Sequence, residues 1–264
     1  MSLKSGLTGA RVLVTGASQG IGFAAAHAFL EEGARVVINS SNADRLGEAI
    51  RRLSSAGEVH GVVADLTQKE GIDKVVGDGV RTLGGLDTLV YVTGSPKPGI
   101  FMEQGFAEWE AAARLLMISP AYLARTAAEA MMRSGSGGRM VFSASLSIRE
   151  PIPTIATSNV ARIAIAGLVR TLARELGPKG VRVNGVLPGY ILTDRIEEVA
   201  RDRAKRQGTT PELARKQLES EIPLGRMGTP EELARVFVFL GSDMSSYVSG
   251  ALVPVDGALA RSVG

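Results

Sequence analysis

The stretch from Val12 to Gly22 constrains the fold of this chain more than any other. It reads VLVTGASQGIG: an apolar run stops at a glycine, and a second pair of glycines opens an alanine-rich run. This is the pattern of a buried strand, a tight turn and a helix, which brings the unpaired N–H groups of the helix N-terminus to the strand end. Glycine-rich turns also serve only to join elements, but the position directly after a strand favours binding of a dinucleotide diphosphate.

Strand-like and helix-like runs alternate along almost the whole chain. Continuous runs of valine, isoleucine and leucine, typical of strands covered on both faces, predict strands at 12–14, 35–38, 59–64, 88–92, 140–143, 181–186 and 252–255. Helical patterns lie between them at 21–32, 44–54, 69–83, 108–133, 159–176 and 231–240. The alternation predicts an α/β fold, a Rossmann-type doubly wound seven-stranded parallel sheet with helices on both faces.

Length and composition narrow the class of protein. A chain of 264 residues fits one α/β domain over 1–264. The absence of cysteine excludes disulfides and thiol nucleophiles, and the two histidines, His27 and His60, have no partner at ligand spacing, so we expect no metal site. A net charge of +3 without a basic stripe argues against nucleic acid. With no apolar run of membrane length and no signal sequence, we expect no membrane association and a cytoplasmic location.

One polar segment interrupts the alternation. Residues 194–220 are rich in arginine and glutamate and predict two short helices, the second starting at Thr210-Pro211-Glu212. The segment is either a solvated helical excursion or, as part of a block at 194–226, a mobile lid over the pocket. Its place directly after a strand end favours the lid.

Further motifs follow the glycine loop at spacings that cover nearly the whole chain. They are Thr15-Gly16-x-x-x-Gly20-x-Gly22, Asp65, Trp109, Gly138-Arg139-Met140-Val141, Arg182-Val183-Asn184, Pro188-Gly189-x-Ile191-x-Thr193, Pro223-Leu224-Gly225-Arg226 and Val255-Asp256-Gly257. Together they resemble the short-chain dehydrogenase/reductase family, in particular its 3-oxoacyl-carrier-protein reductases. The resemblance implies a strand order of 3-2-1-4-5-6-7, NAD or NADP as cofactor, a small carbonyl or alcohol substrate and a homotetramer.

The same resemblance implies which residues hold the cofactor. They are Gly16, Ser18, Gln19, Gly20, Ile21, Gly22, Asn39, Ser40, Ser41, Asp65, Leu66, Thr93, Gly94, Arg162, Pro188, Gly189, Ile191 and Thr193.

The catalytic residues of the family are mostly replaced. The family serine aligns with Ser145, but the Tyr-x-x-x-Lys position reads Ser158-Asn159-Val160-Ala161-Arg162. The family asparagine position is Leu116, and the motif after the fourth strand reads Tyr91-Val92-Thr93-Gly94. One of the four catalytic side chains is therefore kept.

These replacements change the chemistry that the site offers. A serine hydroxyl is a far weaker acid than the family tyrosine, whose pKa a lysine lowers from about 10. Ser145 and Ser158 remain able to polarise a substrate oxygen by hydrogen bonding. Arg162 stays charged, and it either orients the nicotinamide ribose, as the lysine does, or binds a substrate carboxylate or phosphate. A plain surface position is the weaker interpretation, because the family position faces the cleft.

Two sources of the missing proton remain. Pro120 deprives the carbonyl of Leu116 of its helical donor and should kink the helix, so a water on that carbonyl is one hypothesis. Tyr190, in the loop that the family lays beside the nicotinamide, is a second candidate acid, although packing under the lid explains it better.

Choice of cofactor and substrate is less constrained. Asn39-Ser40-Ser41-Asn42 lacks the acidic residue that favours NAD, and Arg45 and Gln19 are near, which favours NADP slightly. Arg149 lies where substrate should enter and either recognises an anionic partner or is a solvated loop charge.

The sequence is compatible with two functions. The first is an NAD(P)-dependent oxidoreductase with catalytic residues Ser145, Ser158, Arg162 and Tyr190. The second is a catalytically silent nucleotide-binding homologue acting as a sensor or partner subunit. Apolar helical stretches at 117–123 and 161–168 predict a homodimer or homotetramer.

Overall fold

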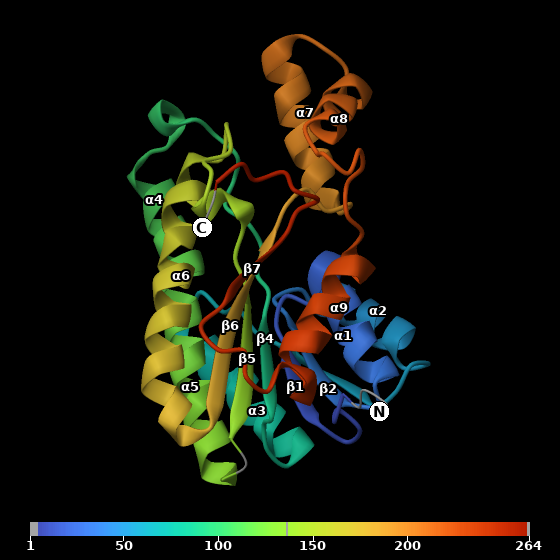
Figure 1. Cartoon of the computed structure of the whole chain (residues 1–264), viewed down its shortest axis with the longest axis vertical. Helices are drawn as coiled ribbons and strands as arrows, with labels where there is room; N and C mark the ends of the chain where they lie inside the picture. Colours follow the sequence, from blue (N-terminus) through green and yellow to red (C-terminus); the bar gives the residue numbers. More distant parts are fainter. Residues whose placement is uncertain (1–4, 136, 263–264) are drawn as a thin grey trace.

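Seven parallel strands form one sheet in the order β3-β2-β1-β4-β5-β6-β7, as predicted (Figure 1). The computed structural model describes residues 5–135 and 137–262. The strands are β1 Arg11–Val14, β2 Arg35–Ser40, β3 Val59–Val63, β4 Thr88–Tyr91, β5 Gly138–Ser143, β6 Val181–Pro188 and β7 Leu252–Val255. The α-helices are α1 Gly20–Glu31, α2 Ala43–Leu53, α3 Lys69–Leu83, α4 Phe106–Ala113, α5 Ser119–Ser134, α6 Ala156–Leu176, α7 Asp194–Gln207, α8 Pro211–Ser220 and α9 Pro230–Leu240.

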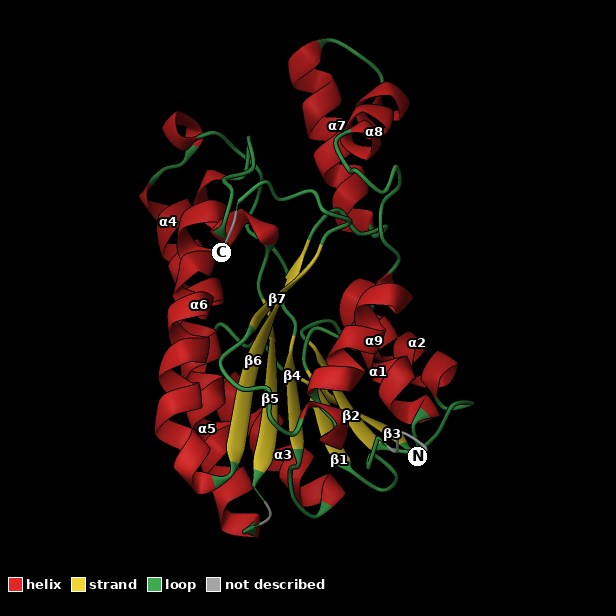
Figure 2. Cartoon of the chain, viewed as in Figure 1, coloured by secondary structure: helices red, strands yellow, loops and turns green. Residues whose placement is uncertain are grey.

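Helices cover both faces of the sheet (Figure 2). Val12 and Val14 of β1 pack with Phe29 of α1 on one face, whereas Leu13 between them packs with α3 on the other. Because alternate residues of a strand point to opposite faces, a strand between two helical layers must be apolar at every position. This explains why the strands appear in the sequence as continuous apolar runs.

The helical run predicted at 108–133 is divided near Leu116, where Pro120 was expected to kink it. The structure has α4, a π-helical turn at Arg114–Ile118, and then α5. In a π turn each carbonyl bonds the N–H five residues on, so in that register Pro120 leaves the Leu115 carbonyl without a donor. The hydroxyl of Tyr91 supplies the missing donor, at 2.9 Å from the Leu115 carbonyl oxygen.

Other helix boundaries are close to those predicted. Helix α9 begins with a capping box in which Thr229 and Glu232 bond each other's backbone N–H groups, at 3.2 and 2.9 Å. Helix α6 begins three residues earlier than predicted, which places Ser158 in its first turn.

Among the described residues, no helix is both long and apolar enough to cross a membrane.

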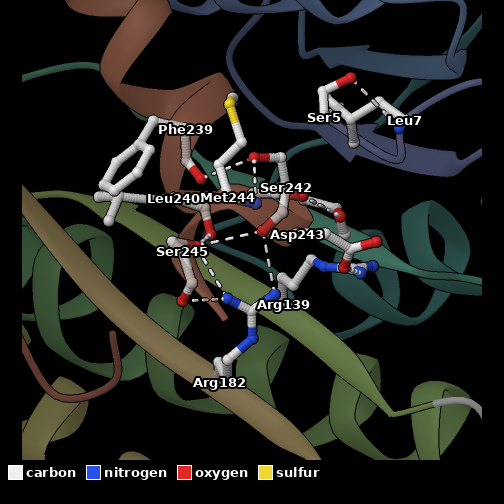
Figure 3. Close-up of polar contacts among 12 residues, drawn as sticks. Ser5, Leu7, Arg139, Arg182, Phe239, Leu240, Ser242, Asp243, Met244 and Ser245 are labelled. Atoms are coloured by element: carbon white, nitrogen blue, oxygen red, sulfur yellow. Dashed lines mark hydrogen bonds and ion pairs between the residues drawn. The ribbon is translucent and has the colours of Figure 1, made fainter. Parts of the chain in front are cut away.

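A cluster of polar side chains lies at the N-terminal ends of β5 and β6 (Figure 3). Arg182 of β6 donates to the hydroxyl and the carbonyl of Ser245 and, at 3.0 Å, to the carbonyl of Ser242. Arg139 of β5 pairs with Asp243, whose N–H in turn bonds the carbonyl of Ser5 at 2.9 Å. The cluster therefore ties the N-terminal segment and the turn after α9 to the sheet, at the end opposite to the cavity described below.

Replacing Arg182 with methionine should destabilise the fold, because the carbonyls of Ser242 and Ser245 would lose their guanidinium donors. We expect the free energy of unfolding to fall by about 1–3 kcal/mol, measured by urea denaturation. Arg81→Met is the matched control, since Arg81 is an exposed residue paired with Asp78 on the same helix and should change stability by less than about 0.5 kcal/mol. Equal effects of the two substitutions would contradict this role.

Candidate active site

A cavity of about 400 Å³ lies at the carboxyl ends of the central strands. The glycine loop, the ends of β4, β5 and β6, the first turns of α6 and residues of α7 form its wall. The structure brings the following predicted site residues together around it: Gly16, Gln19, Gly20, Ile21, Thr93, Gly94, Ser145, Ser158, Arg162, Pro188, Gly189, Tyr190, Ile191 and Thr193.

The glycine loop has the geometry of a diphosphate cradle. Gly16 has a φ of 57°, and a Cβ there would lie 2.6 Å from the carbonyl oxygen of Val92. A Cβ on Gly22 would lie 2.4 Å from the carbonyl oxygen of Gly16, so the first turn of α1 packs directly on the loop. The side chain of Gln19 does not cap this helix within the described chain, which leaves first-turn N–H groups for an anion. The loop therefore fits a dinucleotide diphosphate.

The remaining predicted cofactor residues lie outside the cavity lining. They are Ser18, Gly22, Asn39, Ser40, Ser41, Asp65 and Leu66. The amide nitrogen of Asn39 donates to the carbonyls of Val62 and Ala64, and the carboxylate of Asp65 accepts from the N–H and hydroxyl of Thr67. Close by, Arg45 donates to the side-chain oxygen of Gln19 at 3.3 Å, so a cation borders the glycine loop after β2.

Arg162 is the structural centre of the cavity floor. Its side chain is buried, with the residue 7% exposed. Nε donates to the hydroxyl of Ser158 at 3.0 Å, Nη1 to the carbonyl of Ala144 at 2.9 Å, and Nη2 to the hydroxyl of Ser95 at 3.1 Å. The guanidinium therefore joins α6 to the ends of β5 and β4. The interpretation of Arg162 as a surface residue is wrong.

The charge of Arg162 has no counter-ion in residues 5–135 and 137–262. Loss of hydration on burial lowers the pKa of the guanidinium to about 10, and the charge of Arg195 also lowers it. The group stays cationic at neutral pH. Arg195 itself is paired with Glu198 at 3.0 Å and donates to the carbonyl of Pro96 at 3.1 Å.

Both serine hydroxyls keep a proton for a ligand. The Ser158 hydroxyl accepts the bond from Arg162, and the Ser145 hydroxyl accepts from the N–H of Ser147 at 3.1 Å. A hydroxyl that accepts one bond still has its own O–H to donate. The cavity floor therefore presents donors from Ser145, Ser158 and Arg162 together, an arrangement that stabilises negative charge on an oxygen.

Tyr190 lines the cavity, but its phenol faces the helical segment after β6. The hydroxyl lies 3.3 Å from a carboxylate oxygen of Glu221, and burial together with this carboxylate raises the pKa of Tyr190 to about 12. A phenol with a raised pKa is a weaker acid at neutral pH. The position fits packing under the helical segment better than proton donation.

Helices α7 and α8 stand over the strand ends (Figure 1). Their apolar faces pack together around Ile196, Ala200 and Leu218, and α8 starts at Pro211 as predicted. Arg206 of α7 pairs with Glu103 at 2.8 Å, and the bond from Arg195 to Pro96 ties α7 to the same loop after β4. The segment predicted as a lid therefore lines the cavity and is tied to the loop after β4 by these two contacts.

Ser95 and Arg195 are among the site residues that the sequence analysis missed. Ser95 directly follows the Tyr91–Gly94 motif, and Arg195 follows Thr193 by two positions, so adjacency was the available signal. Arg149, considered as an anion-recognition residue, instead donates to the carbonyl of Leu252 at 3.4 Å, beside β7.

Comparison with known proteins adds an independent result. A family model described as Enoyl-(Acyl carrier protein) reductase matches residues 16–259. The chain is 31% identical over 254 residues to the 3-oxoacyl-(acyl-carrier-protein) reductase FabG of Thermotoga maritima, covering 96% of this chain and 98% of that protein. It is 34% identical to the L-rhamnose 1-dehydrogenase (NAD(P)(+)) of Azotobacter vinelandii, covering 94% and 95%. The crystal structure of L-sorbose reductase from Gluconobacter frateurii, complexed with NADPH and L-sorbose, matches with a TM-score of 0.93 at 33% identity, covering 99% and 100%.

The close packing of Gly22 makes a prediction about stability. Gly22→Ala would force a Cβ against the Gly16 carbonyl, so we expect the free energy of unfolding to fall by about 1–3 kcal/mol. Gly77→Ala is the control, because Gly77 is an exposed helical glycine of α3 with nothing within 4 Å of an added Cβ. That substitution should raise stability by about 0.5–1 kcal/mol. Urea denaturation measures both, and a neutral Gly22→Ala would contradict the cradle geometry.

Proposed function

The chain belongs to the short-chain dehydrogenase/reductase family, and from this premise we propose that it reduces small carbonyl compounds with NADPH or NADH. The observation that carries the proposal is that the hydroxyls of Ser145 and Ser158 line the cavity, each with an O–H to donate, beside the cationic Arg162. Such a set stabilises the negative charge that grows on a carbonyl oxygen as its carbon is reduced. Oxidation of an alcohol would instead need a base to accept the hydroxyl proton.

The glycine loop and the other cavity residues would bind different parts of the cofactor. The N–H groups at the start of α1 would hold the cofactor diphosphate, and Thr93, Gly94 and the Pro188–Gly189 turn would border its nicotinamide end. When bound, the nicotinamide supplies the hydride that goes to the substrate carbon. Thr193, which precedes α7, also lines the cavity and would lie beside the bound cofactor.

The proton for the carbonyl oxygen must come from water. Among the described residues that line the cavity there is no histidine or lysine, and the phenol of Tyr190 is held by Glu221. Ser158 is positioned by Arg162 and would hold the oxygen while a water molecule protonates it. A water on the Leu116 carbonyl is one way to hold this proton source, since a π turn interrupts the helix there and the hydroxyl of Tyr91 bonds the neighbouring Leu115 carbonyl instead.

Several features support NADP as the preferred form. Arg45 donates to Gln19 beside the glycine loop, and the segment Asn39-Ser40-Ser41-Asn42 carries no carboxylate to repel a 2′-phosphate. The similar L-sorbose reductase was crystallised with NADPH.

An alternative function is nucleotide binding without turnover, as a sensor or partner subunit. It is favoured by the loss of the tyrosine–lysine pair, since Ser158 and Arg162 at those positions are far weaker acids than the tyrosine that they replace.

We also propose that the chain forms a homodimer or homotetramer through the outer face of α5 and α6. Met117 and Ile118 of the π turn and Val160 and Ile163 of α6 are each more than half exposed. In Figure 1, α4 and α5 follow one another with α6 beside them, and α6 contacts both α4 and the π turn. An exposed apolar strip on adjacent helices is typical of a subunit contact.

The first test is oxidation of NADPH and NADH by the purified protein over 3-oxo thioesters, small ketones and oxo acids. We expect turnover that falls by roughly a hundredfold in Ser158→Ala, because the substrate oxygen loses a donor in the transition state. Ser55→Ala, at an exposed position after α2, is the control and should keep wild-type activity.

A double variant, Ser158→Tyr with Arg162→Lys, separates the two functions. Activity in the wild type shows that the site reduces carbonyls without the tyrosine. A silent wild type beside an active double variant would refute the proposal and establish the nucleotide-binding alternative.

Cofactor preference is tested at Arg45. We expect Arg45→Met to weaken NADPH binding by roughly tenfold and to leave NADH binding unchanged, because only NADPH carries the 2′-phosphate. Arg51→Met, on the same helix and paired with Glu48, is the control. Binding is measured by the fluorescence of the reduced nicotinamide. A wild type that binds NADH more tightly than NADPH would contradict the preference.

A further inference from the structure

The hydrogen bonds of Arg162 leave part of its guanidinium unused. A guanidinium has five N–H donors. Nε has one, which Ser158 accepts, whereas Nη1 and Nη2 have two each and give one each to Ala144 and Ser95. Two donors therefore remain, one on each terminal nitrogen, on a side chain that lines the cavity. Two donors on adjacent nitrogens match the two oxygens of a carboxylate.

The uncompensated charge of Arg162 also favours the binding of an anionic ligand. A buried cation is costly unless an anion accompanies it, and the three groups that Arg162 bonds are all neutral. Glu198 and Asp194 also line the cavity, but Glu198 pairs with Arg195 and, in the part of the chain that the structure describes, Asp194 forms no ion pair with Arg162. The ribose hydroxyls of a cofactor could accept the two donors, but they are neutral and would leave the charge uncompensated.

We propose that Arg162 binds a carboxylate of the substrate, so that the substrates are short oxo acids. This rests on the proposed function, in which Ser158 holds the carbonyl oxygen. Nε of the same guanidinium lies 3.0 Å from that hydroxyl, so a carboxylate on Nη1 and Nη2 and a carbonyl on Ser158 would lie close together, as they do on neighbouring or next-neighbouring carbons. The substrates are therefore 2-oxo or 3-oxo acids.

The residues that line the cavity limit the size and polarity of the rest of the substrate. The apolar lining of the cavity includes Ile152 and Ile155 before α6, and Ile196 and Val199 of α7. The cavity of about 400 Å³ also includes the space beside the glycine loop and the Pro188–Gly189 turn, where the nicotinamide would lie. What remains suits a small aliphatic group rather than a sugar or a long acyl chain.

Binding is tested without turnover by calorimetry in the presence of NADPH. The probes are oxamate, a non-reducible analogue of a 2-oxo acid, and its neutral methyl ester. We expect the wild type to bind oxamate at least about tenfold more tightly than the ester, and Arg162→Met to lose this difference. Arg170→Met removes an exposed arginine from the same helix and should keep it. Circular dichroism checks that each variant is folded.

Turnover is tested in the wild type alone, which keeps the inference falsifiable if Arg162→Met does not fold. Pyruvate and acetoacetate are compared with their methyl esters, and we expect kcat/KM to be at least about tenfold higher for the acids. Equal rates for acids and esters would refute the carboxylate site while leaving carbonyl reduction intact. Arg162-dependent oxamate binding without any NADPH oxidation would support the carboxylate site and refute the reductase.

One result would reassign the two free donors. If Arg162→Met weakens NADPH binding but preserves the preference for oxamate over its ester, Arg162 serves the cofactor ribose and the inference is overturned.

Discussion

Burial of one guanidinium is the constraint on which the candidate site depends. Arg162 is held by groups from three elements: Ser158 of α6, Ala144 after β5 and Ser95 after β4. These elements meet only because the strand order brings β4 and β5 together and the crossover places α6 above them. The bonds in turn fix the orientation of the Ser158 hydroxyl. Since Arg162 has no counter-ion among the residues that the structure describes, its charge depends on these neutral acceptors.

The fold was predictable because its determinants are local and repeated. Continuous apolar runs identify strands covered on both faces, and the glycine loop identifies where the first helix begins. The strand order came from the resemblance to a family, and the sheet confirms it. The family motifs also indicated most of the cavity lining, including Arg162, although they left its role open between ribose, carboxylate and surface.

What the sequence could not predict are contacts between distant elements. At the π turn, the Leu115 carbonyl accepts its hydrogen bond from the hydroxyl of Tyr91, a residue of β4. Ser95 has no pattern of its own and becomes relevant because Nη2 of Arg162 reaches it. Tyr190 was placed correctly at the cavity, but the direction of its phenol is set by Glu221, 31 positions along the chain.

Exchanging a tyrosine–lysine pair for Ser158 and Arg162 separates two tasks that the pair performs together. Tyrosine both holds the carbonyl oxygen and supplies its proton, whereas in the proposed mechanism Ser158 would hold the oxygen and leave the proton to water. A carboxylate bound to Arg162 would have its charge offset by the guanidinium, so it would donate less electron density to the adjacent carbonyl carbon. That carbon would accept hydride more readily, which would offset part of the loss of a strong acid. An oxo acid thus suits this site on chemical as well as electrostatic grounds.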